Sequence, residues 1–212
     1  MASTDQTRKL ADEIRALIET LTTVDVPPDG ADAATRLVRQ AHEGLGGPPA
    51  PRWYDHDDAF AGRTGASDAF GAQSPFRGAE NPVAPPMVLG DVTRPDGRQV
   101  VEGRVRLSHA YEGPPRGVHG GWVAGLFDDV LGATQHFVAD GGLTGKLTVR
   151  YRQITPIDTD LLFEAWIERD AGRRITSRAT CTAGEVVTAE AEALFIRVEF
   201  EDLRDPTSPR PG

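Results

Sequence analysis

The sequence predicts an α+β protein in which one long apolar helix packs against a single curved antiparallel sheet. Residues 118–138 carry apolar side chains around most of a helix. Residues 87–110 and 147–200 show the alternating pattern of half-buried strands, interrupted by turn residues. A helix that is apolar on all sides is expected to be buried on all sides, so we expect it to lie on the concave face of the sheet.

The order of the predicted elements divides the chain into three parts. Residues 6–22 and 31–47 have the spacing of two amphipathic helices, and residues 46–86 are rich in Gly, Pro, Ala and Asp, which is typical of irregular structure or a linker. Two strands with a turn at 95–97 follow, then the apolar helix, then four strands in hairpin succession. We therefore predict an N-terminal extension at 1–86, a domain at 87–200 and a flexible tail at 201–212.

Composition excludes several classes of function. The net charge of −9 argues against a nucleic-acid partner, which normally requires a basic patch. The single Cys181 cannot form an internal disulfide, and the one cluster of carboxylates and His, at 54–58, lies in a predicted irregular loop, so neither a metal nor a cofactor is expected. The chain has no signal-peptide core and no membrane-spanning apolar stretch of about 18 residues. We expect a soluble, cytoplasmic protein without a membrane partner.

Two adjacent carboxylates, Asp128 and Asp129, interrupt the apolar helix. An ionised carboxylate is costly to bury unless it is paired, so carboxylates in an apolar helix are expected to have a partner or a function. The helical neighbours of Asp128 at 124, 125 and 132 are Ala or Gly, which leaves room for another molecule to approach it. A structural salt bridge or cap remains an alternative for both residues, and nothing in the sequence favours catalysis for Asp129.

The helix begins with His119, Gly120 and Gly121. Glycines at a helix N-terminus expose backbone N–H groups that can polarise a carbonyl or hold an oxyanion. His119 is compatible with a capping or packing role as well as with a catalytic one, and the glycines are compatible with tight packing alone.

The spacing of His119 and Asp128 constrains any shared role. Nine positions at 100° each place the two residues on opposite faces of the helix, about 12 Å or more apart along its axis. One helix cannot direct both groups at one substrate, whereas two helices related by a two-fold axis can. If both groups are catalytic, the sites must be shared between subunits.

The segments "GPPRGVHGGWVAGLFDDVLGA" and "LTGKLTVRYRQITPI" resemble the HGG-motif acyl-CoA thioesterases of the hotdog fold, in the PaaI-like branch. The resemblance covers roughly residues 87–200, and "NPVAPPM" at 81–87 resembles the lead-in of members with N-terminal extensions. It implies a long central helix wrapped by a curved antiparallel sheet, hydrolysis of acyl-CoA without a cofactor, and a homodimer or a dimer of dimers.

The resemblance also implies roles for individual residues. The Gly120 N–H would stabilise the oxyanion, His119 would orient that end of the site or contact the thioester, and Asp128 of the opposing subunit would act as general base or nucleophile. Thr144 matches a Thr that helps to position the water or the carboxylate.

Further residues are expected to contact the substrate. Gly121 belongs to the same helix start, and Trp122 stands where smaller aliphatic residues are common, which would shorten or reshape the acyl pocket. Arg150 and Arg152 are candidates to bind the phosphates of CoA, although their position on a solvated strand edge is the favoured explanation.

Two other functions compete with hydrolysis. The first is a hotdog module that binds acyl-CoA or a fatty acid without catalysis; Asp128 and Thr144 together argue against it, because a binder has no need of a buried acid beside a carbonyl site. The second is a hotdog dehydratase or hydratase, which usually pairs a His with an acid in a different sequence setting.

Overall fold

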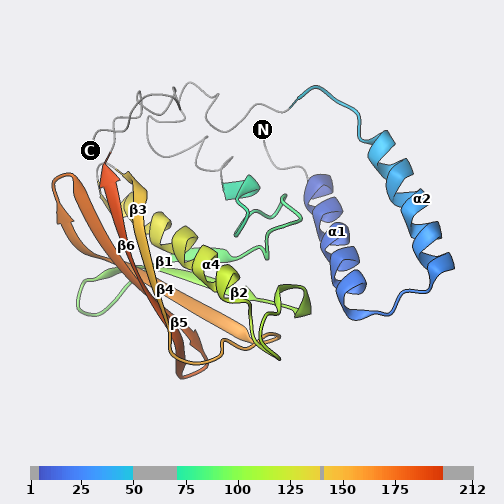
Figure 1. The fold of residues 1–212 in the computed structure, drawn as a ribbon. Helices are drawn as coiled ribbons and strands as arrows, with labels where there is room; N and C mark the ends of the chain where they lie inside the picture. Colours follow the sequence, from blue (N-terminus) through green and yellow to red (C-terminus); the bar gives the residue numbers. More distant parts are fainter. Residues whose placement is uncertain (1–4, 50–70, 139–140, 198–212) are drawn as a thin grey trace.

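The described part of the chain is built around one six-stranded antiparallel sheet (Figure 1). The computed structural model describes residues 5–49, 71–138 and 141–197. The strands are β1 (Val88–Thr93), β2 (Gln99–Arg106), β3 (Gly142–Tyr151), β4 (Asp160–Ala171), β5 (Arg174–Ala183) and β6 (Val186–Arg197). Their order in the sheet is β1-β2-β4-β5-β6-β3. The predicted α+β class is confirmed.

The pairing of β3 corrects one expectation. The hairpins β1–β2, β4–β5 and β5–β6 form as predicted. The succession fails between β3 and β4, because β4 lies between β2 and β5 and has both edges occupied. β3 pairs instead with β6, with Thr148 opposite Glu192, and forms an end of the sheet.

The apolar helix α4 (Gly120–Ala133) crosses the concave face of this sheet (Figure 1). Its buried side chains are Val123, Leu126, Phe127, Val130 and Leu131. Phe127 meets Phe163 of β4 edge to face, with ring centroids 5.0 Å apart. Small buried residues of the sheet, Ala165, Ala179 and Ala193, leave space for the helix to come close.

Two details of the helix differ from the prediction. The α-helix ends at Ala133 and continues as the 3₁₀ turn η3 (Thr134–Phe137), so it is shorter than residues 118–138. The expectation of burial on all sides is wrong, because the face that carries Ala124, Asp128 and Gly132 is only half-buried. The sheet covers one side of α4, and the small residues and carboxylates lie on the other.

The two predicted N-terminal helices are present as α1 (Asp5–Thr23) and α2 (Pro28–Gly44). α1 packs on the short 3₁₀ helix η2 (His109–Tyr111), beside the start of α4, with Ala11 buried. α2 lies beyond α1 and has no buried residue (Figure 1). Residues 50–70 of the predicted irregular segment, which include the carboxylate cluster at 54–58, and the tail at 201–212 lie outside the described residues.

Candidate active site

The start of α4 is held by a tight loop between η2 and the helix. The loop closes through hydrogen bonds from the Gly113 N–H to the Gly117 carbonyl, 2.9 Å, and from the His119 N–H to the Tyr111 carbonyl, 2.9 Å. A side chain at Gly113 could not fit, since its Cβ would lie 2.7 Å from the His119 Cα. Glycine at this position therefore lets the chain turn back and present His119 at the N-terminus of α4.

His119 caps the helix. Its Nδ1 accepts a hydrogen bond from the Gly121 N–H at 3.0 Å, and its side chain is exposed. This is the capping role that the sequence left open beside a catalytic one. This hydrogen bond uses His119 Nδ1 and the Gly121 N–H. Nε2 is therefore the His119 nitrogen that remains able to contact a ligand.

The N–H of Gly120, the first residue of α4, has no hydrogen-bond acceptor among the described residues. The carbonyl of Gly120 accepts a hydrogen bond from the Tyr151 hydroxyl at 2.8 Å, which ties the helix start to the end of β3. The sequence did not single out Tyr151, because nothing in the alternating pattern of a strand reveals a hydrogen bond to a distant carbonyl. The Gly120 N–H is a donor directed along the axis of the helix, where the positive end of its dipole lies.

A cavity of about 350 Å³ opens beside Gly120. Its lining includes Val123, Tyr151, Arg152 and Ile154. The Arg152 guanidinium is bound by Glu190, with an Nη2–Oε2 distance of 2.7 Å. Arg150 does not reach this cavity; it lines a separate hollow with Trp166 and Arg178.

Asp128 and Thr144 meet in the C-terminal half of α4. The Thr144 hydroxyl, on the edge strand β3, donates to Asp128 Oδ1 at 3.0 Å. The carboxylate is only half-buried, on the face of α4 that the sheet leaves open. Eight positions separate Gly120 from Asp128, about 12 Å along the axis, so this chain by itself does not bring the two groups together.

Asp129 faces a different environment from Asp128. Its side chain is 7% exposed, and its Oδ2 lies 3.4 Å from the Arg77 Nη1. Its Oδ1 accepts a hydrogen bond from Ser74 at 3.2 Å. Burial raises the pKa of Asp129, Arg77 and Ser74 oppose this rise, and the charge of Asp128 adds to it. The residue that the sequence could not explain thus holds residues 74–77 against α4.

The raised pKa of Asp129 predicts a pH dependence of stability. Between the unfolded and the higher folded pKa, the folded state holds a proton that the unfolded state has lost, so lowering the pH through this window stabilises the fold. We expect the free energy of unfolding of the wild type to rise relative to Asp129→Asn as the pH falls from 7. Urea unfolding of both proteins at several pH values measures the difference in their free energies of unfolding. A fall of the wild-type value relative to Asp129→Asn as the pH is lowered would contradict a raised pKa of Asp129.

Part of the space predicted around Asp128 is already filled. Phe76 lies against Gly125, where an added Cβ would be 2.3 Å from its ring. The same ring meets Trp122 edge to face at 5.8 Å, and Trp122 meets Tyr111 at 4.8 Å. Gly125 therefore serves to seat Phe76, while at Gly132 an added Cβ would meet nothing within 4 Å.

The part of the chain that the structure describes contains neither a membrane-spanning helix nor a cluster of metal-binding side chains. Residues 5–49, 71–138 and 141–197 contain no helix that is long and apolar enough to cross a membrane. In the same ranges, no group of three or more His, Cys, Asp or Glu side chains is arranged to hold a metal ion.

Comparison with known proteins defines the class of the fold. A solved crystal structure of a thioesterase superfamily protein has a TM-score of 0.74 to this chain and is 28% identical to it, over 92% of each chain. The chain has the hotdog fold, with α4 as its central helix. No family model matches the sequence.

Curated relatives are named acyl-coenzyme A thioesterases. The chain is 30% identical over 89 residues to acyl-coenzyme A thioesterase THEM4 of Xenopus laevis, a match that covers 41% of this chain and 40% of the relative. It is 23% identical over 95 residues to THEM5 of Homo sapiens, covering 43% and 38%. These matches span about two fifths of the length of each curated relative.

Proposed function

We propose that the protein hydrolyses acyl-CoA thioesters at sites shared between two copies of the chain. In each site the Gly120 N–H of one subunit binds the thioester carbonyl, and Asp128 of the opposing subunit provides the carboxylate. The observation that carries the proposal is the contact between Thr144 and Asp128. This contact holds the half-buried Asp128 carboxylate on the face of α4 that the sheet does not cover. The free Gly120 N–H lies at the N-terminus of the same helix.

The chemistry needs a base and an oxyanion donor. Asp128 either removes a proton from the attacking water or attacks the carbonyl itself; in both cases the tetrahedral oxygen accepts a hydrogen bond from the Gly120 N–H. On the general-base route, collapse of the intermediate breaks the C–S bond, and the thiolate takes the proton that Asp128 removed from water, which gives the carboxylic acid and CoA as the thiol. On the nucleophilic route, collapse leaves a mixed anhydride between the acyl group and Asp128; water hydrolyses it to the acid and the free carboxylate, and its proton goes to the thiolate. Thr144 orients the carboxylate. His119 Nε2 lies at the same helix start, where a thioester would bind.

A homodimer is supported by the exposed edge of the sheet. β3 ends the sheet, and Leu143, Tyr151 and Ile154, on or just after this strand, are exposed apolar residues. An edge strand with exposed apolar side chains favours pairing with another chain. Two copies joined along β3 would bring the start of one α4 near the Asp128 of the other. Arg152, at the cavity beside Gly120, is better placed than Arg150 to meet the phosphates of CoA.

Thr144→Val tests the contact that carries the proposal. We expect a loss of kcat of about tenfold or more with little change in KM, because Val keeps the shape of Thr but cannot orient the base. Release of free thiol from acyl-CoA measures the rate. Thr148→Val, the same change on the same strand and away from Asp128, is the matched control and should retain activity.

The same assay separates the competing functions. Thiol release by the wild type supports a hydrolase. Binding of acyl-CoA without thiol release would instead indicate the non-catalytic module, and equal rates for the two Val variants would contradict the role of Thr144.

A further inference from the structure

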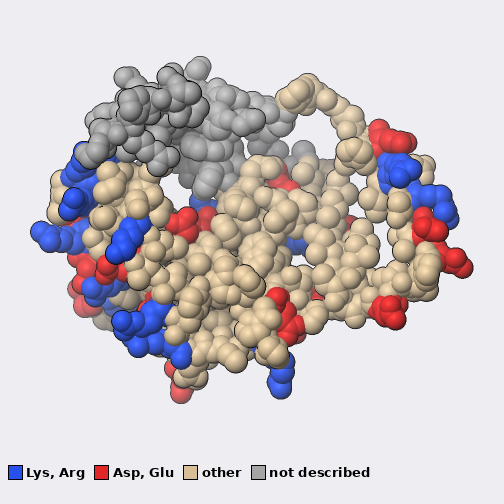
Figure 2. Space-filling view, viewed as in Figure 1, with Lys and Arg blue, Asp and Glu red and all other residues tan. Residues whose placement is uncertain are grey.

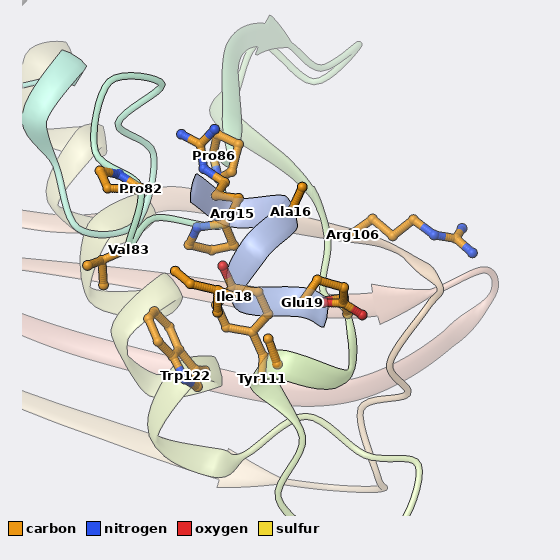
Figure 3. Close-up of a pocket in the computed structure, with 13 residues that line it drawn as sticks. Arg15, Ala16, Ile18, Glu19, Pro82, Val83, Pro86, Arg106, Tyr111 and Trp122 are labelled. Atoms are coloured by element: carbon orange, nitrogen blue, oxygen red, sulfur yellow. The ribbon is translucent and has the colours of Figure 1, made fainter. Parts of the chain in front are cut away.

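A second cavity, of about 550 Å³, lies on the other side of the start of α4. Its walls come from α1, from residues 82–86 and from η2, with Trp122 at the first turn of α4 (Figure 3). Apolar groups, among them Ile18, Val83, Tyr111 and Trp122, make up much of the lining. Its volume lies within the range typical of small-molecule sites.

Polar contacts hold the α1 wall in place. The Arg15 side chain, 14% exposed, donates to the main-chain carbonyls of Ala79 at 2.8 Å, Ala84 at 3.0 Å and Asn81 at 3.2 Å. One turn further along α1, Glu19 accepts a hydrogen bond from the Ser108 hydroxyl. On the helix that these contacts hold, the apolar Ile18 lines the cavity and is 37% exposed.

The charged groups at the cavity already have protein partners. Arg15 is bound by carbonyls, Glu19 by Ser108, and Arg106 by Asp160 at 3.4 Å. In Figure 3 the Arg106 side chain points away from Tyr111 and Trp122. Figure 2 shows few charged side chains on the surface between α4 and α1, in contrast to the strand surface at the left. The chemistry of the cavity therefore suits a neutral, apolar ligand rather than an anion.

The cavity lies at the same end of α4 as Gly120, because Trp122 in the first turn lines it. Helical side chains lean toward the N-terminus of their helix, so the Trp122 ring and the Gly120 N–H are directed toward the same end of α4. The Trp122 ring contacts Tyr111, whose carbonyl binds the His119 N–H. A thioester carbonyl bound at Gly120 would have this apolar cavity on one side and the cavity of Arg152 on the other.

We propose that the cavity between α1 and Trp122 binds the acyl chain of the substrate, and that Ile18 on α1 sets the length of chain accepted. The inference rests on the proposed hydrolysis and adds its substrate class, thioesters of medium-length apolar acids. It assigns a function to α1, a helix outside the sheet and its central helix.

Replacing Ile18 with a larger side chain and with a smaller one tests this assignment. With butyryl-CoA as the short reference, Ile18→Trp should lower the ratio of kcat/KM for octanoyl-CoA to that for butyryl-CoA about tenfold, because the larger ring fills the cavity. Ile18→Ala should shift the preference toward palmitoyl-CoA. Leu21→Trp and Leu21→Ala are the matched controls, since Leu21 is on the same helix, is 59% exposed and does not line the cavity.

The outcomes distinguish this inference from the proposed function. Unchanged ratios in an active enzyme, or a shift produced by Ile154→Ala and not by Ile18→Ala, would overturn the inference and leave hydrolysis intact. If the wild type cleaves no thioester, calorimetric titration with 1-decanol, an uncharged molecule with an apolar chain, decides the matter. Binding that Ile18→Trp abolishes and Leu21→Trp preserves would support the cavity as an apolar-chain site, whereas binding indifferent to Ile18 would exclude it.

Discussion

Replacing Asp128 with asparagine is expected to reduce kcat for acyl-CoA hydrolysis by about 10²–10⁴-fold, the range in which a positioned acid or base contributes. Asn keeps the size of the side chain and can still accept the hydrogen bond that Thr144 donates at 3.0 Å. It can neither take a proton from water nor attack the carbonyl. The loss should therefore appear in kcat, with the circular dichroism spectrum and the unfolding transition unchanged.

The neighbouring carboxylate provides the matched control. Asp129→Asn makes the same chemical change one position along the helix, at a side chain that faces Ser74 and Arg77. This variant should keep most of the activity. An Asp128→Asn variant that turns over at a rate near the wild type would refute the role of Asp128, and equal losses at both positions would point to a general effect on α4.

Removing the free N–H at the start of α4 is expected to cost about 10²–10³-fold in kcat, as for other oxyanion donors. Gly120→Pro does this with little harm to the helix. Gly120 is its first residue, where proline is favoured, and His119 before it has φ −59° and ψ 131°, which suit the residue that precedes a proline. Gly120→Ala is the control, because it adds a Cβ close to the Tyr151 hydroxyl, 3.3 Å away, but retains the N–H. Equal activity of the Pro and Ala variants would exclude the N–H as the donor.

Mixing the two inactive proteins tests whether sites are shared. If Gly120 and Asp128 act from opposing subunits, a dimer of one Asp128→Asn chain and one Gly120→Pro chain contains one intact site and one doubly defective site. After random exchange of subunits, half of the dimers are mixed, so activity should return to about a quarter of the wild-type rate. Failure to recover activity, with exchange verified by mass spectrometry of tagged chains, would contradict a shared site.

The local pattern of residues predicted much of this fold. The alternation in residues 87–110 and 147–200 indicated the strands, because a strand with one buried face must alternate, but β3 begins at Gly142, before the predicted start at 147. The two N-terminal helices followed from helical spacing in the same way. The sequence did not predict the partner of β3, because strand pairing depends on which strand edges remain free after β2 has paired with β4.

The two aspartates of α4 show the same difference between what a local pattern predicts and what contacts between distant residues decide. Their place in an apolar helix indicated that each needs a partner or a function. The sequence offered no signal for Ser74 and Arg77, which contact Asp129 across more than fifty positions from an irregular segment without periodicity. The contact of Thr144 with Asp128 was expected only through the family resemblance, and it is present in the structure.

Residue spacing and local backbone geometry were enough to predict the helices and strands, the glycine-rich helix start and the half-turn that separates His119 from Asp128. The tertiary structure decided which carboxylate remains open to solvent, where β3 pairs, and that α1 and Trp122 enclose a cavity. These features arise from contacts between residues far apart in the chain. Such contacts depend on how the layers pack and which edges and faces are left uncovered, and no local pattern encodes them.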